Sequence, residues 1–259
     1  MKFVIIITVK TQFINTMSSK TAPLGNNADV LVTNPEIFES ESIQYGDVQV
    51  NANGGKELYL KYDGKPLLFQ TPRISCPFGL TFTENPEKDG KPASKNYRIA
   101  VSFRGYNDPK DKSYEKKRDF YDMLTKIDDA NIKAGQTNSL PWIKLPQKTA
   151  TDEVVRALYN PTIKENGNGD YPPLMNLSIQ APDGKWITEV YDKDKKRVEN
   201  PEEVITRGCE IKCLVQAQKI TFPQGKFGVK YSILNMKVWP NKTAIRNRGC
   251  LIDDESDEE

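Results

Sequence analysis

Histidine is absent from this chain of 259 residues. Its absence excludes Ser-His-Asp and Cys-His catalysis, histidine metal ligation and the commonest general base near neutral pH. The cysteines, at positions 76, 209, 213 and 250, form no Cys-x-x-Cys pair and are too widely spaced for a four-cysteine zinc site. They indicate reduced structural thiols in a reducing, intracellular compartment. The sequence therefore favours a protein that is not an enzyme and needs no metal or cofactor.

Apolar residues are also scarce, at 37% of the chain with a mean hydropathy of −0.63. This composition suits a small β-barrel with long polar loops better than an enzyme built on a large buried parallel sheet. The apolar run at residues 3–9 is too short to span a bilayer and has no signal-peptide cleavage site after it, so no membrane association is expected. Residues 1–16 are either an extension upstream of Met17 or an additional edge strand.

Charge is unevenly distributed along the chain. The last eight residues hold six carboxylates and no base, whereas the rest of the chain holds 37 bases against 29 acids. The six are Asp253, Asp254, Glu255, Asp257, Glu258 and Glu259. Such a run of like charges predicts a disordered tail. The tail would compete with a polyanion for the protein's own Lys and Arg side chains, or, in the plainer alternative, only raise solubility.

Short β-type runs with turn signals between them lie on both sides of a helical segment. These runs are 43–50, 57–62, 66–70, 74–83 and 96–104 before the segment, and 174–179, 185–191, 210–222 and 226–239 after it. Between residues 113 and 133 apolar residues recur at three- and four-residue spacing, which predicts an amphipathic helix. A second, shorter helix should be capped by Thr151 and end before Pro161.

This order of elements predicts a mainly β fold, an OB-fold-like antiparallel Greek-key barrel with a helix between its third and fourth strands. The expected organisation is a flexible N-terminal arm at 1–41, a single OB-fold-like domain at 42–251 and a disordered acidic tail at 252–259. The helical insert of the domain falls at about 113–160. A jelly-roll sandwich is the alternative, but the two helices in the middle of the chain make it the less favoured fold.

An OB-fold binds single strands with cations that contact phosphates and exposed aromatic rings on which bases stack. Three strand segments and one loop interleave such residues. The candidate DNA-binding residues are Tyr59, Lys61, Arg98, Arg104, Trp142, Lys144, Lys226, Lys230 and Tyr231. Strand alternation places Tyr59 with Lys61 opposite two core leucines, and Lys226 with Lys230. The same alternation groups Phe227, Tyr231, Lys237 and Trp239 on the other face of the last strand.

Core packing is the competing expectation for each aromatic ring in this set. Trp142, between two prolines, would either present its ring beside phosphate-binding cations or fasten the helical insert to the barrel. Neighbouring carboxylates at Asp128-Asp129, Asp192–Asp194 and Asp253-Asp254 are expected to be solvated charge, so no metal site is predicted.

Residues 205–259 resemble the phage-type single-stranded DNA-binding proteins found in large nucleocytoplasmic eukaryotic DNA viruses. The resemblance rests on the pattern Val215-x-x-x-Lys219-Ile220-x-Phe222-x-x-Gly225-Lys226-Phe227-Gly228-Val229-x-Tyr231-x-Ile233, followed by Met236-x-Val238 and an acidic C-terminus. The order of strands and helix extends this resemblance, more loosely, back to residue 43. It implies an OB-fold that coats single-stranded DNA during viral DNA replication, repair and recombination, in a cytoplasmic viral factory or the nucleus of the host cell.

The resemblance also implies a role for residues 253–259. In that family the tail occupies the DNA groove when DNA is absent and contacts replication proteins, such as DNA polymerase or helicase-primase, when DNA is bound. The phage relatives end in an aromatic residue whereas this chain ends Asp257-Glu258-Glu259, so electrostatic competition carries over and docking through a terminal ring does not. A homodimer is left open. The alternative function is that of a structural or interaction protein, such as a jelly-roll virion component whose acidic tail recruits a partner.

Overall fold

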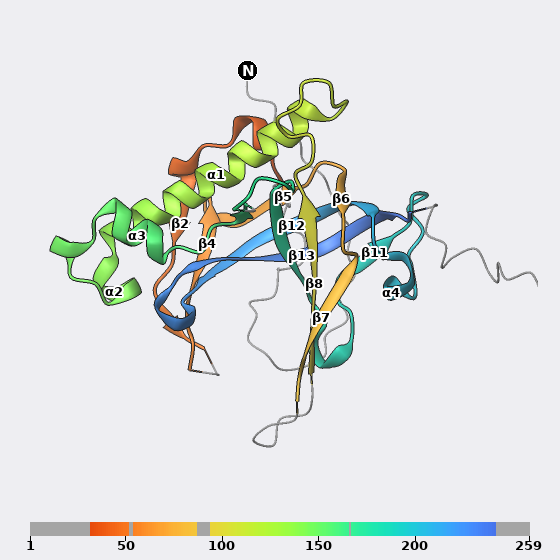
Figure 1. Ribbon diagram of the computed structural model, residues 1–259. Helices are drawn as coiled ribbons and strands as arrows, with labels where there is room; N and C mark the ends of the chain where they lie inside the picture. Colours follow the sequence, from red (N-terminus) through yellow and green to blue (C-terminus); the bar gives the residue numbers. More distant parts are fainter. Residues whose placement is uncertain (1–31, 52–53, 87–93, 166, 242–259) are drawn as a thin grey trace, which may run out of the picture.

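A computed structural model describes residues 32–51, 54–86, 94–165 and 167–241 (Figure 1). The chain forms a β-rich sheet, and its longer helices lie in the middle third of the chain. The predictions for residues 1–16 and for the acidic tail at 252–259 lie outside the described residues. None of the helices in the described ranges is long and apolar enough to cross a membrane.

The strands are short except for the last hairpin. They are β1 (Val32–Thr33), β2 (Ile43–Tyr45), β3 (Gln49–Val50), β4 (Lys56–Tyr62), β5 (Lys65–Gln70), β6 (Ile74–Cys76), β7 (Leu80–Asn85), β8 (Ser94–Ser102), β9 (Ile163–Lys164), β10 (Leu174–Ile179), β11 (Glu189–Tyr191), β12 (Cys209–Thr221) and β13 (Gly228–Trp239). The helices are α1 (Tyr114–Thr137), α2 (Ser139–Ile143), α3 (Asp152–Leu158) and α4 (Pro201–Val204), and single 3₁₀ turns are η1 (Pro35–Ile37), η2 (Ser40–Ser42), η3 (Gln147–Thr149), η4 (Pro182–Gly184) and η5 (Pro223–Gly225).

The sheet is organised around β12, the longest strand. One edge of β12 pairs with β13 in antiparallel orientation, and the other edge pairs in succession with β4, β5 and β6. Further pairings link β6 to β8, β8 to β10 and β10 to β13, the last of these in parallel orientation. The pairings therefore return to their starting strand and form a closed cycle of β12, β6, β8, β10 and β13.

The helical segment lies between β8 and β10, which are the second and third strands of this cycle in chain order. The expected position between the third and fourth strands is therefore wrong. The runs at 57–62 and 66–70 do pair with β12, the second of them just ahead of β6. Neither is one of the five strands of the cycle, so β6 is the first of those strands in the chain. The helices themselves form where their spacing predicts, and the Thr151 hydroxyl accepts a hydrogen bond from the Val154 amide at 3.4 Å.

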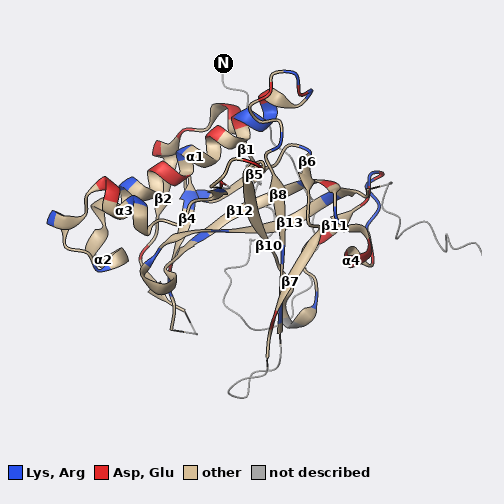
Figure 2. Ribbon diagram, in the orientation of Figure 1, with Lys and Arg blue, Asp and Glu red and all other residues tan. Residues whose placement is uncertain are grey.

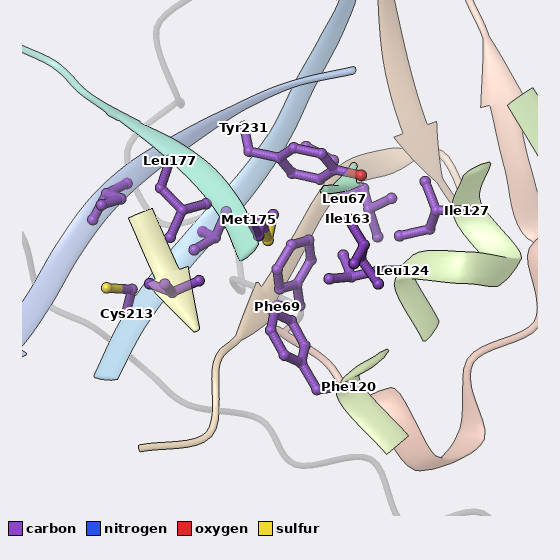
Figure 3. Packing of buried hydrophobic residues seen from close by; sticks show 14 of the residues in the cluster. Leu67, Phe69, Phe120, Leu124, Ile127, Ile163, Met175, Leu177, Cys213 and Tyr231 are labelled. Atoms are coloured by element: carbon purple, nitrogen blue, oxygen red, sulfur yellow. The ribbon is translucent and has the colours of Figure 1, made fainter. Parts of the chain in front are cut away.

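Helix α1 packs its apolar face against the inner side of the sheet. Phe120 of α1 is fully buried, with ring centroids 5.7 Å from Phe69 of β5 and 5.6 Å from Phe103. Figure 3 shows Leu124 and Ile127 of the same helix in this cluster. The core therefore joins the helical insert to the strands of the cycle and holds the sheet in position.

The folded body includes residues before the expected boundary at Ser42. Strand β1 pairs in parallel orientation with β5, through Val32 opposite Leu68 and Thr33 opposite Phe69. Phe38 is 3% exposed and stacks on Tyr62 with ring centroids 5.2 Å apart. Residues 32–41 are thus part of the folded body and not a flexible arm, because their apolar side chains complete the core beside β4 and β5.

Candidate nucleic-acid interface

Directly paired residues form one continuous row across five strands. Gln216 of β12 pairs with Ser232 of β13, Ser232 with Ser178 of β10, Ser178 with Arg98 of β8, and Arg98 with Thr81 of β7. Side chains directly opposite one another lie on the same face of a sheet. Arg98 and Thr81 are exposed, whereas Ile99 beside them is buried. The row therefore lies on the face of the sheet opposite Ile99, exposed at Arg98 and Thr81 and buried at Ser232.

A second row runs along the same face. Lys230 precedes Ser232 by two residues and so shares its face. It is paired with Lys219 of β12, which is paired in turn with Tyr59 of β4, and Lys61 follows Tyr59 by two residues. We call the surface formed by Tyr59, Lys61, Arg98, Lys219 and Lys230 the basic face. Figure 2 shows Lys and Arg positions along the strands that form it.

Lys219 is held in position by a carboxylate. Its Nζ lies 2.7 Å from Glu57 Oε2 and 5.8 Å from the centre of the Tyr59 ring. Burial would by itself raise the pKa of Glu57, but hydrogen bonds from Lys219 and Asn51 outweigh it and hold that pKa below its ordinary value. Glu57 is therefore charged at neutral pH and orients the Lys219 ammonium beside the ring.

The other cations of the basic face have no such partner. Among the described residues, no carboxylate lies within ion-pair distance of Lys61, Arg98 or Lys230. Partial desolvation and repulsion from Lys219 lower the pKa of Lys230. An Nη atom of Arg98 donates to the Thr83 hydroxyl at 2.9 Å, which fixes the guanidinium on the sheet. Lys61, Arg98 and Lys230 thus present positive charge without an ion pair, whereas Lys219 is paired with Glu57.

Two of the expected rings are not on the surface. Tyr231 is 4% exposed, and its hydroxyl lies 3.0 Å from that of Thr162, inside the core shown in Figure 3. Trp142 is 5% exposed and packs its ring edge-on against Tyr45 and Phe227. The prediction that these rings line an exposed groove is wrong. Trp142 instead fastens α2 to the sheet, as its alternative interpretation held.

A β-bulge explains where the alternation of the last strand fails. The register between β12 and β13 shifts between Leu214 and Val215, so that Leu234 is the extra residue on β13. Tyr231 lies inward before the bulge, whereas Lys237 and Trp239 lie outward after it, on the side of Lys230. The predicted common face of Tyr231, Lys237 and Trp239 is therefore wrong.

The bulge creates a second aromatic and cationic group at the far end of the hairpin. The Arg73 guanidinium lies 4.4 Å from the centre of the Trp239 ring, and Lys237 Nζ lies 5.2 Å from it. Arg73 also forms an ion pair with Glu210, the residue directly opposite Trp239. The sequence prediction grouped Lys237 with Trp239 but missed Arg73, which comes from the segment before β6, distant in the chain.

Three predicted cations lie on the surface away from the two rows. Arg104 follows β8 by two residues, and its carbonyl accepts a hydrogen bond from Lys117 at 3.0 Å. Lys144 ends α2 in the left-handed region at φ 57°. Lys226 follows the β12–β13 turn. All three are exposed, so their contact with a nucleic acid stays a prediction.

Lys219 and Phe82 are further candidates that the sequence prediction did not include. Phe82 is 51% exposed, with Lys95 Nζ 4.6 Å from the centre of its ring. It is paired with Tyr97, whose side chain points away from the Arg98 face, so it belongs to the opposite side of the β7–β8 hairpin. Alternation in the run Leu80 to Asn85 could have indicated this ring, whereas only the register reveals Lys219.

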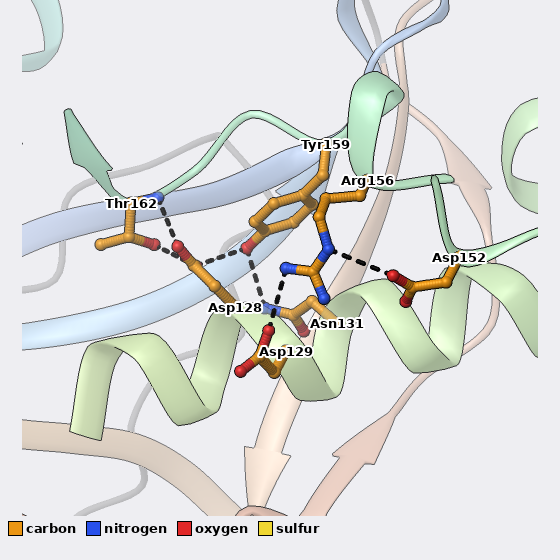
Figure 4. A network of polar contacts seen from close by, with 7 residues as sticks. All are labelled: Asp128, Asp129, Asn131, Asp152, Arg156, Tyr159 and Thr162. Carbon is orange, nitrogen blue, oxygen red and sulfur yellow. Dashed lines mark hydrogen bonds and ion pairs between the residues drawn. The ribbon is translucent and has the colours of Figure 1, made fainter. Parts of the chain in front are cut away.

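Asp128 departs from the expectation of solvated charge. It is 9% exposed and accepts hydrogen bonds from the Tyr159 hydroxyl at 2.7 Å, the Thr162 amide at 2.7 Å and the Thr162 hydroxyl (Figure 4). Burial raises its pKa to about 6 despite these bonds. Its neighbour Asp129 is exposed and pairs with Arg156 at 3.1 Å. The helical spacing between 128 and 131 places Asp128 inward, against the segment that joins α3 to β9.

The described cysteines are buried thiols. Cys76 of β6 and Cys209 of β12 are directly paired, and Cys213 lies on the same strand face as Cys209. Burial raises the pKa of Cys213 above its ordinary value, which keeps its thiol protonated. Within the ranges that the structure describes, no three His, Cys, Asp or Glu side chains are grouped to hold a metal ion.

Comparison with known proteins gives a result only among solved structures. No family model matches the chain, and no curated protein matches it. It is similar to the single-stranded DNA-binding protein from bacteriophage Enc34 in complex with ssDNA, with a TM-score of 0.37 and 11% identity over 76% of this chain and 93% of that one. A second structure of the same phage protein has a TM-score of 0.37 and 8% identity over 76% of this chain and 90% of that one. Its C-terminal truncation has a TM-score of 0.34 and 10% identity over 78% of this chain and 98% of that one. With identities this low, the case for a function rests on the residues of this chain.

Proposed function

We propose that this protein binds single-stranded DNA without strong sequence preference, along the basic face. The observation that carries the proposal is the strand register, which brings Lys219, Lys230 and Arg98 from three different strands to one outward surface beside Tyr59. Such a surface contacts phosphates wherever they lie along a strand, and it contains no feature that would read base edges.

Stacking would come from rings near the ends of the β12–β13 hairpin. Tyr59 is partly exposed beside Lys219, and Trp239 lies outward beside Arg73 and Lys237. Each base stacked on an aromatic ring contributes ~1–3 kcal/mol, and every base offers such a face. A single strand running along the hairpin would therefore meet rings at both ends and cations between them, whereas a duplex keeps its bases inside.

We propose further that the closed cycle is an OB-fold-like barrel, with β6, β8, β10, β12 and β13 as its five strands. In OB-folds the second and third strands and the loops after the first and fourth bind oligonucleotides. Here these correspond to β8, β10, the β7–β8 hairpin and the turn at η5, and the basic face includes Arg98 of β8. The jelly-roll alternative gains no support from pairings that form one cycle instead of two facing sheets.

The acidic tail is the proposed regulator of this surface. Its carboxylates, from Asp253 to Glu259, are opposite in charge to the basic face, so they would compete with DNA until DNA displaces them. Once free, the tail would contact replication proteins such as DNA polymerase or helicase-primase. The biological setting that we propose is viral DNA replication, repair and recombination in an infected cell, where the protein coats and protects single strands without catalysing a reaction.

Fluorescence anisotropy of a labelled oligo-dT strand and of a matched duplex tests the proposal. Both would be titrated with the full chain and with a chain ending at Leu251, at two salt concentrations. We expect a preference for the single strand, weaker binding at higher salt and tighter binding by the shortened chain. If neither chain binds, the DNA proposal is wrong and a protein partner becomes the better explanation. If both chains bind the single strand equally well, DNA binding by the basic face is supported and competition by the tail is refuted.

A further inference from the structure

The sheet opens beside the basic face, where β10 changes partners. Met175 and Leu174 of β10 pair with β9, whereas Ser178 and Ile179 pair with β13. The first residues of β13 are therefore separated from β10, and a recess of about 170 Å³ lies between them. It is lined by Asn160, Thr162, Lys164, Asn176, Gly228 and Tyr231, among others.

The walls of this recess are fixed by close contacts. The Asn160 amide donates to the Phe227 carbonyl at 2.7 Å. A Cβ atom added at Gly228 would lie only 2.8 Å from the Asn160 carbonyl oxygen, so only glycine permits this approach. At the floor, the hydroxyls of Tyr231 and Thr162 lie 3.0 Å apart. The Thr162 hydroxyl also donates a hydrogen bond to the Asp128 carboxylate. The recess is therefore preformed.

The recess carries positive charge at its rim. Lys164 Nζ donates to Asn160 Oδ1 at 2.8 Å, and an ammonium group has two further donors. Desolvation lowers the pKa of Lys164 and nearby Lys226 lowers it further, whereas the buried Asp128 opposes both. Asn176 is exposed and precedes Ser178 by two residues, so it lies on the outward face, level with Lys230. An anion here would relieve the repulsion between the two lysines.

We infer that this recess binds one backbone phosphate of the single strand, at the Lys164 ammonium and beside the Asn176 amide. The inference rests on the proposed function and adds a fixed point to it. With about 170 Å³ the recess is smaller than the ~300–1,000 Å³ of typical small-molecule pockets, which suits a phosphate group and excludes a whole nucleotide. One seated phosphate would set the register of the strand along the basic face.

A larger hollow elsewhere lacks these properties. It has about 510 Å³ and lies between α1 and the η2–β2 segment. Lys126 and Lys133 line it together with Glu41 and Asp129, so its charges of both signs cancel. A polyanion would gain little there, which leaves the recess at β9 as the site for phosphate.

Thermal unfolding in inorganic phosphate, compared with chloride at equal ionic strength, tests the recess without DNA. The variants are Lys164→Gln, which removes the ammonium, and Asn176→Asp, which places a carboxylate at the exposed rim. Lys133→Gln is the matched control, because it removes an exposed lysine outside the recess. Phosphate stabilises proteins generally by exclusion from their surface, so the informative quantity is the difference between variants.

We expect phosphate to raise the Tm of the wild type and of Lys133→Gln more than that of Lys164→Gln or Asn176→Asp. An equal rise in all four proteins would overturn the recess. In a second measurement, Lys164→Gln should lower the salt slope of oligo-dT binding by ~0.7, the value of one single-strand phosphate contact, whereas Lys133→Gln should not. If the variants differ in phosphate as expected but the wild type binds no DNA, the proposed function fails and the recess stands. If DNA binding is normal but the variants do not differ, the recess proposal fails and the proposed function stands.

Discussion

Replacing Asp128 by asparagine changes how the stability of the protein depends on pH. Asp128 is buried between α1, α3 and β9, and its pKa of about 6 lies above the ordinary value of 3.8. The folded state therefore holds a proton that the unfolded chain has released between these two values. Stability from this group is fully present below pH ~4 and is lost as the pH rises to ~6, in contrast to a salt-bridged carboxylate.

The size of this effect follows from the shift. A rise from 3.8 to about 6, at ~1.4 kcal/mol per pKa unit, corresponds to ~3 kcal/mol of unfolding free energy. Asparagine does not titrate, so it lacks this dependence. If the asparagine keeps its oxygen toward the Thr162 amide, its NH2 group faces the Tyr159 and Thr162 hydroxyls, which donate to Oδ1 in the wild type. That conflict should cost ~1–3 kcal/mol at every pH.

Urea unfolding of the wild type and of Asp128→Asn, at a series of pH values from 4.5 to 7.5, separates the two terms. We expect the stability advantage of the wild type to shrink by ~2 kcal/mol across this range, with a residual offset at the upper end. Exposed Asp129→Asn is the matched control and should show no comparable trend, because that carboxylate is solvated. An advantage that stays constant, or that grows with pH, would refute the assignment of a protonated, buried carboxyl.

Three further changes test the surface and its framework. Charge reversal of Arg98 and Lys230 together should weaken oligo-dT binding and lower its salt slope by ~0.7 for each lost contact. Charge reversal of exposed Lys133 should leave the slope unchanged. If the double variant and the Lys133 variant have equal slopes, Arg98 and Lys230 are not part of the interface. Tyr59→Ala should cost ~1–3 kcal/mol of binding free energy in anisotropy titrations with unchanged Tm, and unaltered affinity would exclude stacking on this ring. Gly228→Ala should lower stability by ~1–3 kcal/mol in urea unfolding, because its Cβ would lie 2.8 Å from a backbone oxygen of the α3–β9 segment; wild-type stability would mean that this segment yields easily.

Local patterns in the sequence predicted the elements well. Alternation placed Tyr59 and Lys61 opposite Leu58 and Leu60, and the structure buries both leucines. The spacing of apolar residues predicted α1, and the cap at Thr151 predicted the start of α3. Each of these features depends only on residues a few positions apart, whose contacts follow from the geometry of a helix or a strand.

The face of each residue beyond a bulge could not be predicted in this way. Leu234 is an additional residue on β13, so a two-residue period carried from Tyr231 to Trp239 ends on the wrong side. The basic face has the same origin, because Lys230 and Arg98 meet only through the register of β13, β10 and β8. Burial of Trp142 also depends on Phe227, a residue distant in the chain. The faces beyond the bulge, the basic face and the burial of Trp142 all depend on contacts between residues that are distant in the chain.

The position of β12 in the chain determines the order in which the protein can fold during synthesis. Strand β12 pairs with β4, β5 and β6, yet roughly half of the chain separates Cys76 of β6 from Cys209, its partner. Until the ribosome has made β12, the earlier strands have an unpaired edge, which slows folding and invites aggregation. The Cys76 thiol is fully buried once the cycle closes, so its resistance to a pulse of alkylating reagent would report the moment of closure on nascent chains.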